Sequence, residues 1–472
     1  MLAATGALSS SLLAPKLMAS ARGTGSIGDI SALRNQLPGA LVTPTDPSYH
    51  RDRIGKGFTP VADRFPSYIV LPESADDVAQ ALAFAQARNL DVSIRSGGND
   101  ILAASTTATG VLIDLVRMNG ISFDRETGVA TVGAGARAGA LVTAVDGSGW
   151  SPVVGNNPHV GIGGLMLGGG MGWLAGKYGA AVDHLLSAQL VTADGSILEV
   201  SAENHPDLFW ALRGGGGNFG VVTAFTIQMQ RVSSVLGGVL SYRVDPAGFL
   251  RFYREFLAKS PDELDLAAVF STGPMPSLFL KACWLGNQTE GWEILQPLRD
   301  FAVPDVDTIA PQAYAAFAND RQISSLNRLF WRGGEFDGLT DERIDLLAQV
   351  ITGTDMKDCS IGVGHYMHGA LCRTPFDSSP FIRTAGNLVY TVNAFWADSA
   401  GQAEMDRKRE WAVASFQSLE TQACDRTYIN YLGHADSKAV QRSFGPHYDR
   451  LRAVKRRYDP GNVFINNRNI AV

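Results

Sequence analysis

Two glycine-rich clusters constrain the fold of this chain more than any other feature. Residues 161–172 read GIGGLMLGGGMG, and residues 214–220 read GGGGNFG. Glycine has no Cβ and adopts positive φ without strain, so such clusters mark backbone that turns sharply or closely approaches a ligand. Glycine makes up about 11% of the chain, 51 of 472 residues, against a usual share of roughly 7%. We therefore expect a folded protein whose backbone contacts a bound molecule.

Size, charge and cysteine spacing narrow the class of partner. A chain of 472 residues predicts about two to four domains. The formal net charge is −6 and no basic block occurs, which argues against nucleic acid as a partner. No apolar run reaches the ~18 to 20 residues of a membrane span. The four cysteines lie far apart without a CxxC pair, so no metal site is indicated. We expect a small-molecule substrate and either a monomer or a homodimer.

The N-terminal 21 residues, MLAATGALSSSLLAPKLMASA, are apolar and rich in small side chains. A secretory signal needs a charged segment ahead of its apolar stretch, and none precedes Leu2. Two interpretations stay open. The segment is either the remnant of a twin-arginine export signal, which would send the protein to the periplasm or outside the cell, or a loosely docked tail of a cytoplasmic protein.

The second glycine cluster contains a GxGxxG pattern at Gly215, Gly217 and Gly220. A Rossmann dinucleotide site needs a strand before these glycines and a helix after them. Here the order is reversed, because the helical HPDLFWALR precedes them and the strand-like VVTAFTIQM follows. A different candidate is Arg95-Ser96-Gly97-Gly98 after the strand VSI. Its backbone N–H groups would form either an anion site for a pyrophosphate or an ordinary turn.

Strands and helices alternate along the first half of the chain. The patterns predict a helix over 75–89 capped by Ser74, a strand ending at Arg95, and strand pairs within 121–135 and 185–200. Later, 359–371 and 387–396 are strand candidates. A basic helix should end at Asp459, where Pro460 and Gly461 follow.

Several long motifs occur in an order typical of one protein family. They are RSGG at 95–98, GIGGLMLGGGMGWL, KYGAAVDHLLSAQLVTADG, DLFWALRGGGGNFGVVT, Tyr428-Ile429-Asn430-Tyr431 and YDRLRAVKRRYDPGNVF. The chain resembles the berberine-bridge-enzyme-like branch of the FAD-linked oxidases, in the vanillyl-alcohol-oxidase superfamily. The resemblance implies an α+β fold. It would have a PCMH-type FAD-binding domain that consists of two α/β subdomains. This domain would be discontinuous in the sequence, formed by residues 46–232 together with 425–472. A substrate domain at 233–424 would carry an antiparallel sheet covered by helices, and residues 1–45 would be a tail.

The resemblance also implies FAD contacts. Gly97 and Gly98 would meet the pyrophosphate, the glycines of the first cluster would pass beside the isoalloxazine ring, and Gly220 with Val221 would lie near the adenine half. Each glycine taken alone fits an ordinary turn equally well. The full set of expected contacts is Arg95, Ser96, Gly97, Gly98, Asn99, Asp100, Asn157, Val160, Gly161, Gly163, Gly164, Leu165, Gly168, Gly169, Gly170, Gly220, Val221, Val222 and Asn467.

Two positions depart from the family. Most members attach FAD through a histidine directly after RSGG, and many through a cysteine as well; here these positions hold Asn99 and Asn157. An amide nitrogen is a poor nucleophile because its lone pair is delocalised into the carbonyl, so we expect non-covalent FAD. Since covalent attachment raises the oxidising power of the flavin in this family, the resemblance also implies that the flavin here is a milder oxidant. His159 is the only nearby imidazole; it would either offer another attachment or be a partly exposed polar residue with no such role. Val160 occupies the position that gates dioxygen in this family, and its small side chain favours an oxidase.

The expected reaction takes a hydride from a carbon bearing OH or NH to flavin N5 and passes the electrons to dioxygen, giving hydrogen peroxide. By resemblance, Tyr431 would be the base, with Tyr428 beside it, although an aromatic packing role also fits. A base of this kind needs a neighbouring cation to lower its pKa. The rival functions are a non-redox cyclase or isomerase that retains FAD, and a flavin-free binding protein.

The two strand candidates of the substrate domain contain no Asp or Glu, so no carboxylate base is evident there. On a strand, His365 and His368 would point to opposite faces and would not share a metal. The candidates for substrate contact are His365, Tyr366, Tyr390 and Asn393, each of which would equally serve as a structural polar group.

Overall fold

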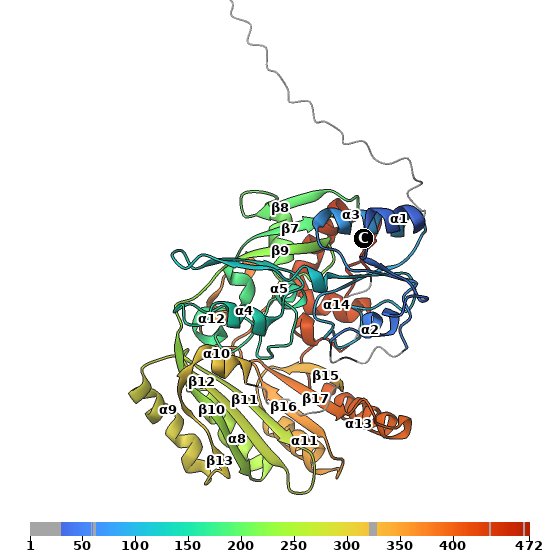
Figure 1. Cartoon of the computed structure of the whole chain (residues 1–472). Coiled ribbons are helices and arrows are strands. Elements are labelled where there is room, and N and C mark those ends of the chain that lie inside the picture. The colour runs from blue at the N-terminus through green and yellow to red at the C-terminus, as the bar shows by residue number, and fades with distance from the viewer. Residues whose placement is uncertain (1–29, 58, 60–62, 321–327, 434–435, 466–467) are drawn as a thin grey trace, which may run out of the picture.

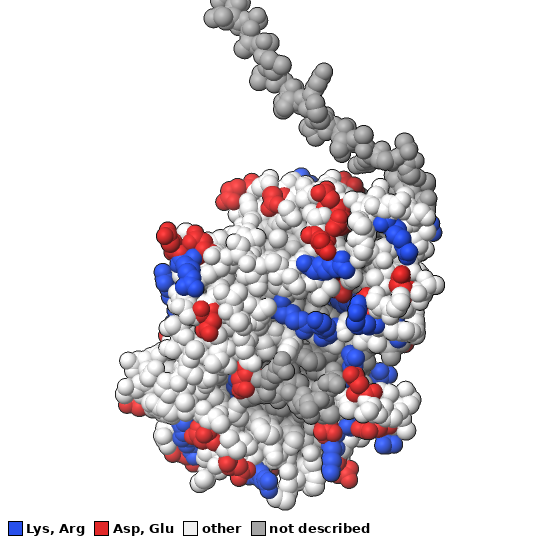
Figure 2. Space-filling view, viewed as in Figure 1, with Lys and Arg blue, Asp and Glu red and all other residues white. Residues whose placement is uncertain are grey.

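The structure is a computed structural model that describes residues 30–57, 59, 63–320, 328–433, 436–465 and 468–472 (Figure 1). The first 29 residues, which include most of the predicted tail, and Asn467 lie outside the described residues. Three sheets organise the chain, two in the upper part of Figure 1 and one large sheet in the lower part. Within the described residues, no helix is both long enough and apolar enough to cross a membrane. Side chains of both charges are interspersed over the face in Figure 2.

The first sheet has four strands in the order β1-β2-β4-β3; β4 pairs in parallel with both β2 and β3, whereas β1 is antiparallel to β2. The strands are β1 Leu41–Val42, β2 Tyr68–Val70, β3 Val92–Arg95 and β4 Val111–Asp114. Helix α3, Ala75–Ala87, connects β2 to β3 and begins at the predicted cap, since Ser74 Oγ accepts from Asp77 N at 3.2 Å. Strand β1 pairs with β2, so this sheet begins before residue 46, the expected domain boundary. A two-residue strand leaves almost no periodic signal.

The second sheet is antiparallel, with five strands in the order β5-β6-β9-β7-β8. The strands are β5 Ile121–Phe123, β6 Val129–Gly133, β7 Leu185–Val191, β8 Ile197–Ser201 and β9 Val221–Gln228. Both predicted strand pairs are confirmed. Helix α7, Pro206–Leu212, precedes the second glycine cluster and β9 follows it, which confirms that the GxGxxG glycines are not in a Rossmann context. The first cluster forms helix α5, Ile162–Gly168.

The third sheet is antiparallel and joins eight strands in the order β13-β10-β12-β11-β16-β17-β15, with β14 on β10. The strands are β10 Ser234–Arg243, β11 Leu264–Ser271, β12 Ser277–Trp284, β13 Val306–Asp307, β14 Ala310–Ala313, β15 Arg328–Phe336, β16 Cys359–Gly364 and β17 Leu388–Trp396. Four helices pack on one face and bury its apolar side chains: α8 Pro246–Leu257, α9 Gln288–Phe301, α11 Asp341–Thr352 and α13 Gln402–Glu420. The expected helix-covered antiparallel sheet is therefore present.

One predicted strand is too long. Strand β16 ends at Gly364, and His365 adopts a left-handed φ of +47°. The chain then runs into α12, Gly369–Arg373, so the strand predicted over 359–371 is wrong beyond residue 364. Apolar residues 367 and 371 continued the pattern although the backbone had already turned. The opposite-face argument for His365 and His368 therefore does not apply.

The C-terminal segment returns to the glycine clusters. It contains the short helix η4, Ile429–Tyr431, then α14, Ser437–Phe444, and α15, Tyr448–Tyr458. The end of α15 at Asp459 is as predicted. The buried Lys455 Nζ donates to the Asp459 carboxylate at 2.6 Å and to the Asn218 carbonyl at 2.9 Å, which ties this helix to the second cluster. The remaining helices are α1 Ile30–Gln36, α2 Tyr49–Ile54, α4 Ala138–Ala144, α6 Ala175–Tyr178 and α10 Tyr314–Asn319.

Candidate functional site

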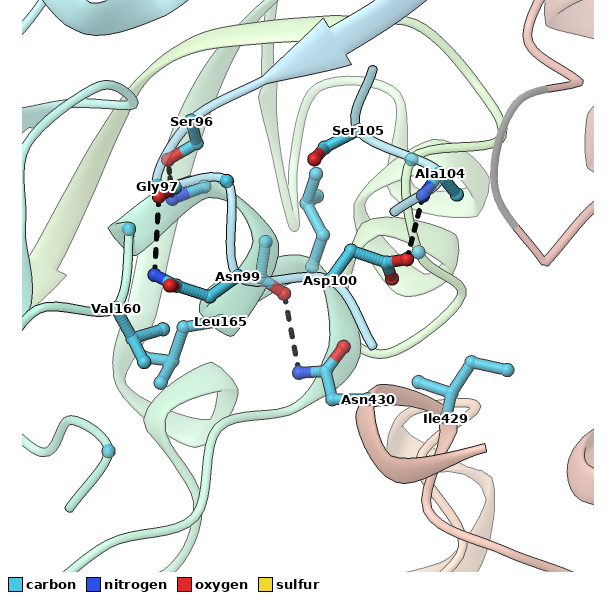
Figure 3. Close-up of a pocket in the computed structure, with 18 of the residues that line it drawn as sticks. Ser96, Gly97, Asn99, Asp100, Ala104, Ser105, Val160, Leu165, Ile429 and Asn430 are labelled. Atoms are coloured by element: carbon cyan, nitrogen blue, oxygen red, sulfur yellow. Dashed lines mark hydrogen bonds between the residues drawn. The ribbon is translucent and has the colours of Figure 1, made fainter. Parts of the chain in front are cut away.

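A cavity of about 440 Å³ lies where the glycine-rich segments meet the third sheet (Figure 3). One side of it is lined by the loop 96–100 after β3, by residues around α5 and by residues of the segment 216–222. The third sheet and the C-terminal segment line the other side. This volume falls in the range of about 300–1,000 Å³ typical of small-molecule sites. Among the described residues, no group of acidic, histidine or cysteine side chains is arranged to hold a metal.

The RSGG loop and the start of α5 are in direct contact. Ser96 Oγ donates to the Ala134 carbonyl at 2.6 Å and accepts from Gly163 N at 3.2 Å. A Cβ on either Gly97 or Gly161 would fall on the backbone of the other. Glycine is therefore needed at both positions so that the two segments can touch beside the cavity.

Gly164 has a different environment from its neighbours. A Cβ added to it would meet no protein atom within 4 Å, and the residue lines the cavity. Its missing side chain therefore leaves space for a ligand, as the expected flavin contact requires. The next glycines do not do this. A Cβ at Gly168 would strike the Asn430 side chain, at Gly169 the Phe381 ring, and at Gly170 the Ala181 methyl group.

Gly168, Gly169 and Gly170 therefore permit close packing of protein segments and lie outside the lining of the cavity, and their contact with FAD stays a prediction. Arg95 also lies outside the lining of the cavity. Its buried guanidinium pairs with Asp114 at 2.7 Å and donates to the Arg53 carbonyl at 2.7 Å, so it holds the loop from behind. The motif fixes residue types but not the neighbours that surround them, so it did not predict these placements.

Asn99 and Asn157 both line the cavity. Asn99 Nδ2 donates to the carbonyls of Gly97 at 3.2 Å and His159 at 3.1 Å, as Figure 3 shows for the first of these. Asn157 Oδ1 accepts from His159 N at 2.9 Å. His159 does not line the cavity, whereas Val160 does. Leu165, Gly220, Val221 and Val222 also lie in the lining.

An ion pair between Asp100 and Arg468 closes one side of the cavity. Asp100 Oδ1 also accepts from Leu102 N and Ala104 N, both at 2.9 Å, and Arg468 Nη2 donates to the Leu432 carbonyl at 3.0 Å. Burial lowers the pKa of Arg468 to about 10. No sequence signal pointed to Arg468, because no local pattern links it to Asp100, 368 residues away.

The two motif tyrosines have different surroundings. Tyr428 Oη accepts from Gly170 N at 2.8 Å and from Asn430 Nδ2 at 2.9 Å, and burial raises its pKa to about 12. Tyr431 Oη lies 3.0 Å from His365 Nε2, and burial raises its pKa as well. The expected cation is replaced by a neutral ring, because burial lowers the pKa of His365 to about 4.

The third sheet contributes part of the expected substrate set. Asn393 lines the cavity with His365, and its Nδ2 donates to Thr391 Oγ1 at 3.0 Å. Tyr390 points to the other face of β17, where it is fully buried and stacks on Phe336. Tyr366 stacks on His368 outside the lining. The lining residues that the sequence did not single out include Leu329, Trp331 and Thr391 of the third sheet.

Family comparisons agree with this architecture. Residues 66–201 match the model of an FAD binding domain, and residues 427–471 match the model described as berberine and berberine like. (R)-6-hydroxynicotine oxidase of Paenarthrobacter nicotinovorans is 31% identical over 431 residues, covering 86% of this chain and 91% of that protein. An uncharacterized FAD-linked oxidoreductase of Bacillus subtilis is 28% identical over 444 residues, covering 91% and 97%.

Solved structures share the fold over nearly the whole chain. The crystal structure of 6-hydroxy-D-nicotine oxidase from Arthrobacter nicotinovorans matches with a TM-score of 0.82 and 27% identity, covering 92% of this chain and 98% of that one. Berberine bridge enzyme from Eschscholzia californica matches with a TM-score of 0.81 and 21% identity, covering 94% and 99%. The cradle left open at Gly164, the paired loops and these matches lead to one assignment: the chain belongs to the berberine-bridge-enzyme-like family of FAD-linked oxidoreductases.

Proposed function

We propose that this protein is an oxidase that holds FAD without a covalent bond and oxidises an uncharged small molecule at a carbon bearing OH or NH. The observation that carries the proposal is the placement of Tyr431 and Asn393 in a cavity whose charged described lining residues are one ion pair, Asp100 with Arg468. Apart from this ion pair, which lies in the proposed cofactor cradle, a charged substrate would meet no charged side chain among the described lining residues, and that is costly in a desolvated pocket.

The cofactor would be held by the loop 96–100, the start of α5 and residues 216–222. When bound, FAD supplies the hydride acceptor and the route of the electrons to an external acceptor. Asn99 supports non-covalent binding, because its amide nitrogen is not nucleophilic and already donates to two carbonyls. None of the described residues that line the cavity is a cysteine.

Tyr431 would accept the proton that leaves the substrate as its carbon is oxidised. It lines the cavity beside Trp331, whose ring lies 5.1 Å from the tyrosine ring. The Asn393 amide would orient the substrate, since its Nδ2 is engaged by Thr391 and its Oδ1 remains to accept a hydrogen bond. An aromatic wall with neutral hydrogen-bonding groups suits an alcohol or an unprotonated amine.

Dioxygen is the proposed electron acceptor, with hydrogen peroxide as the product. The support is Val160, a small and partly exposed side chain at the cavity wall between the RSGG loop and α5. A bulkier residue there would narrow access to this part of the cavity.

The proposal is tested on the purified protein in two steps. The visible spectrum should show oxidised flavin, and acid precipitation should release all of it into the supernatant; a yellow pellet would refute non-covalent binding. Sugars, aromatic alcohols and cyclic amines, including (R)-6-hydroxynicotine because of the relative's name, are then screened for anaerobic bleaching and for peroxide in air. Product formation without bleaching would instead identify a non-redox isomerase or cyclase.

A further inference from the structure

His365 and Tyr431 form a side-chain pair inside the cavity. His365 Nε2 lies 3.0 Å from Tyr431 Oη, and the ring planes are nearly perpendicular, at 76°. Both residues line the cavity, from segments 66 positions apart in the sequence. The histidine is therefore placed to exchange a proton with the tyrosine that the proposed function uses as base.

The backbone at His365 is unusual. The residue follows the last position of β16 and has a φ of +47°, a region that non-glycine residues rarely occupy. Such conformations persist where the surroundings enforce them, and they cluster at functional sites. A regular continuation of β16 would alternate side chains across the sheet. The left-handed turn instead directs the imidazole to Tyr431.

The protonation states of the pair decide which partner donates. Burial keeps the phenol of Tyr431 protonated and the imidazole of His365 neutral at pH 7, with Asp265 as the nearby charge that partly opposes the effect on His365. If the phenol donates to Nε2, the lone pairs of Oη face the cavity. If Nε2–H donates, His365 has no lone pair on that nitrogen and takes no proton from Tyr431.

We propose that His365 is the final proton acceptor of the oxidation and acts through Tyr431. The inference rests on the proposed function. As the substrate carbon gives up its hydride to bound FAD, the proton of the substrate O–H or N–H moves to Tyr431 Oη, and the phenol proton moves to His365 Nε2. The substrate thus loses one hydride, which carries both electrons, and one proton; the tyrosine is unchanged overall, and the histidine becomes an imidazolium.

The other polar side chains considered as acceptors are already engaged or do not take up a proton. The side chains of Asn393 and Thr391 do not take up a proton at neutral pH. Asp100 is already engaged by Arg468 and by two backbone N–H groups. Among the described lining residues, His365 is thus the neutral base in contact with Tyr431.

The first test needs no substrate. In the FAD-loaded protein with ¹⁵N-labelled histidine, the His365 signals are assigned by their loss in His365→Gln. The proposal expects a protonated Nδ1 and an unprotonated Nε2, whose signal shifts when Tyr431→Phe removes the donor. His368→Gln, a change at a histidine outside the cavity, should leave these signals in place. A protonated Nε2 in the unmodified protein, or no shift in Tyr431→Phe, would overturn the proposal.

The second test uses the substrate that bleaches the flavin in the screen above. His365→Gln should lower the limiting rate of flavin reduction by about 100-fold or more, the usual scale of general-base catalysis, with substrate affinity little changed. His365→Gly suits the left-handed backbone and leaves room for a ring, so added imidazole should restore part of its rate. In His368→Gln, the flavin should be reduced at the same rate as in the unmodified protein.

The outcomes separate this proposal from the proposed function. If Tyr431→Phe is slow but His365→Gln is fast, His365 is not the acceptor and the tyrosine base stands. If Tyr431→Phe is also fast, the tyrosine base itself is refuted. A loss in His365→Gln that appears only in substrate affinity would make His365 a binding residue and would overturn the proton route.

Discussion

Asp100 and Arg468 form an ion pair in the cavity wall although 368 residues separate them in the sequence. Asp100 belongs to the loop that follows β3, and Arg468 comes from the last five residues of the chain. The Arg468 side chain is 9% exposed, and its Nε has no hydrogen-bond partner among the described residues. A buried cation with an unused donor at a cofactor cradle is suited to an anionic ligand such as FAD.

Replacing Arg468 by Gln should therefore weaken FAD binding. A hydrogen bond to a charged group contributes about 1.5–3 kcal/mol, so the dissociation constant should rise by about 10- to 100-fold. The measurement is titration of the apoprotein with FAD, followed by quenching of flavin fluorescence. Arg456→Gln, at an exposed position on α15, is the matched control and should bind FAD normally. Unchanged affinity in Arg468→Gln would remove this residue from the cofactor site.

Gly164 and Gly97 should respond differently to alanine. At Gly164 the new methyl group meets no protein atom within 4 Å, so Gly164→Ala should keep or raise the stability of the apoprotein by up to about 1 kcal/mol, since alanine favours a helix. The same methyl group would occupy ligand space and weaken FAD binding. At Gly97 the methyl group would fall on the backbone of Gly161 and cost about 1–3 kcal/mol of stability. Thermal unfolding and FAD titration of the two apoproteins distinguish these effects.

Substitutions of Tyr428 and Tyr431 should also have different effects. Tyr428→Phe removes the acceptor for Gly170 N, and an unsatisfied buried N–H costs about 1–3 kcal/mol, so the main expected effect is lower stability. Tyr431→Phe removes the proposed base and should lower the rate of flavin reduction by about 10²- to 10⁴-fold. Unfolding curves and anaerobic stopped-flow traces of both variants provide the comparison. A large rate loss in Tyr428→Phe with normal stability would exchange the two roles.

The pKa of His365 makes a pH-dependent contribution to stability. It falls from about 6.5 to about 4 on folding, so between these values the unfolded chain binds more protons and acid weakens the fold. His365→Gln lacks this contribution. The free energy of unfolding of His365→Gln, relative to that of the unmodified protein, should therefore rise by about 1–3 kcal/mol as the pH falls from 7 to 4. Urea unfolding at the two pH values measures the difference, and a pH-independent difference would contradict the lowered pKa.

Local patterns predicted the fold where the cause is local. The Ser74 capping box, the β7–β8 hairpin and the end of α15 all depend on neighbouring residues, and the structure confirms them. The sequence did not distinguish a glycine that faces ligand from one that faces protein, because both simply lack a Cβ. Gly164 and Gly168 lie one helical turn apart, yet Gly168 is covered by Asn430 from the far end of the chain.

The residues of the third sheet that face the cavity were harder to predict for a similar reason. The alternating sequence pattern predicts a strand that continues past Gly364. The strand ends there because the next residue, His365, has a left-handed backbone conformation. Tyr390 and Asn393 lie three positions apart on β17, so only one of them faces the cavity. Which face is buried by helices depends on packing from α13, a long-range contact that no local pattern contains.

Restoring an imidazole at position 99 should create a covalent flavin. The Asn99 side chain lines the cavity directly after the RSGG loop, and the amide is held by carbonyls rather than by a charged group. A histidine there would supply a ring nitrogen whose lone pair is free to attack, which the amide nitrogen lacks. Asn99→His should leave yellow colour in the acid-precipitated pellet, while Asn99→Ala, which has no nucleophile, should release all its flavin. A colourless Asn99→His pellet from protein with a full complement of FAD would show that the cavity does not bring position 99 to the flavin.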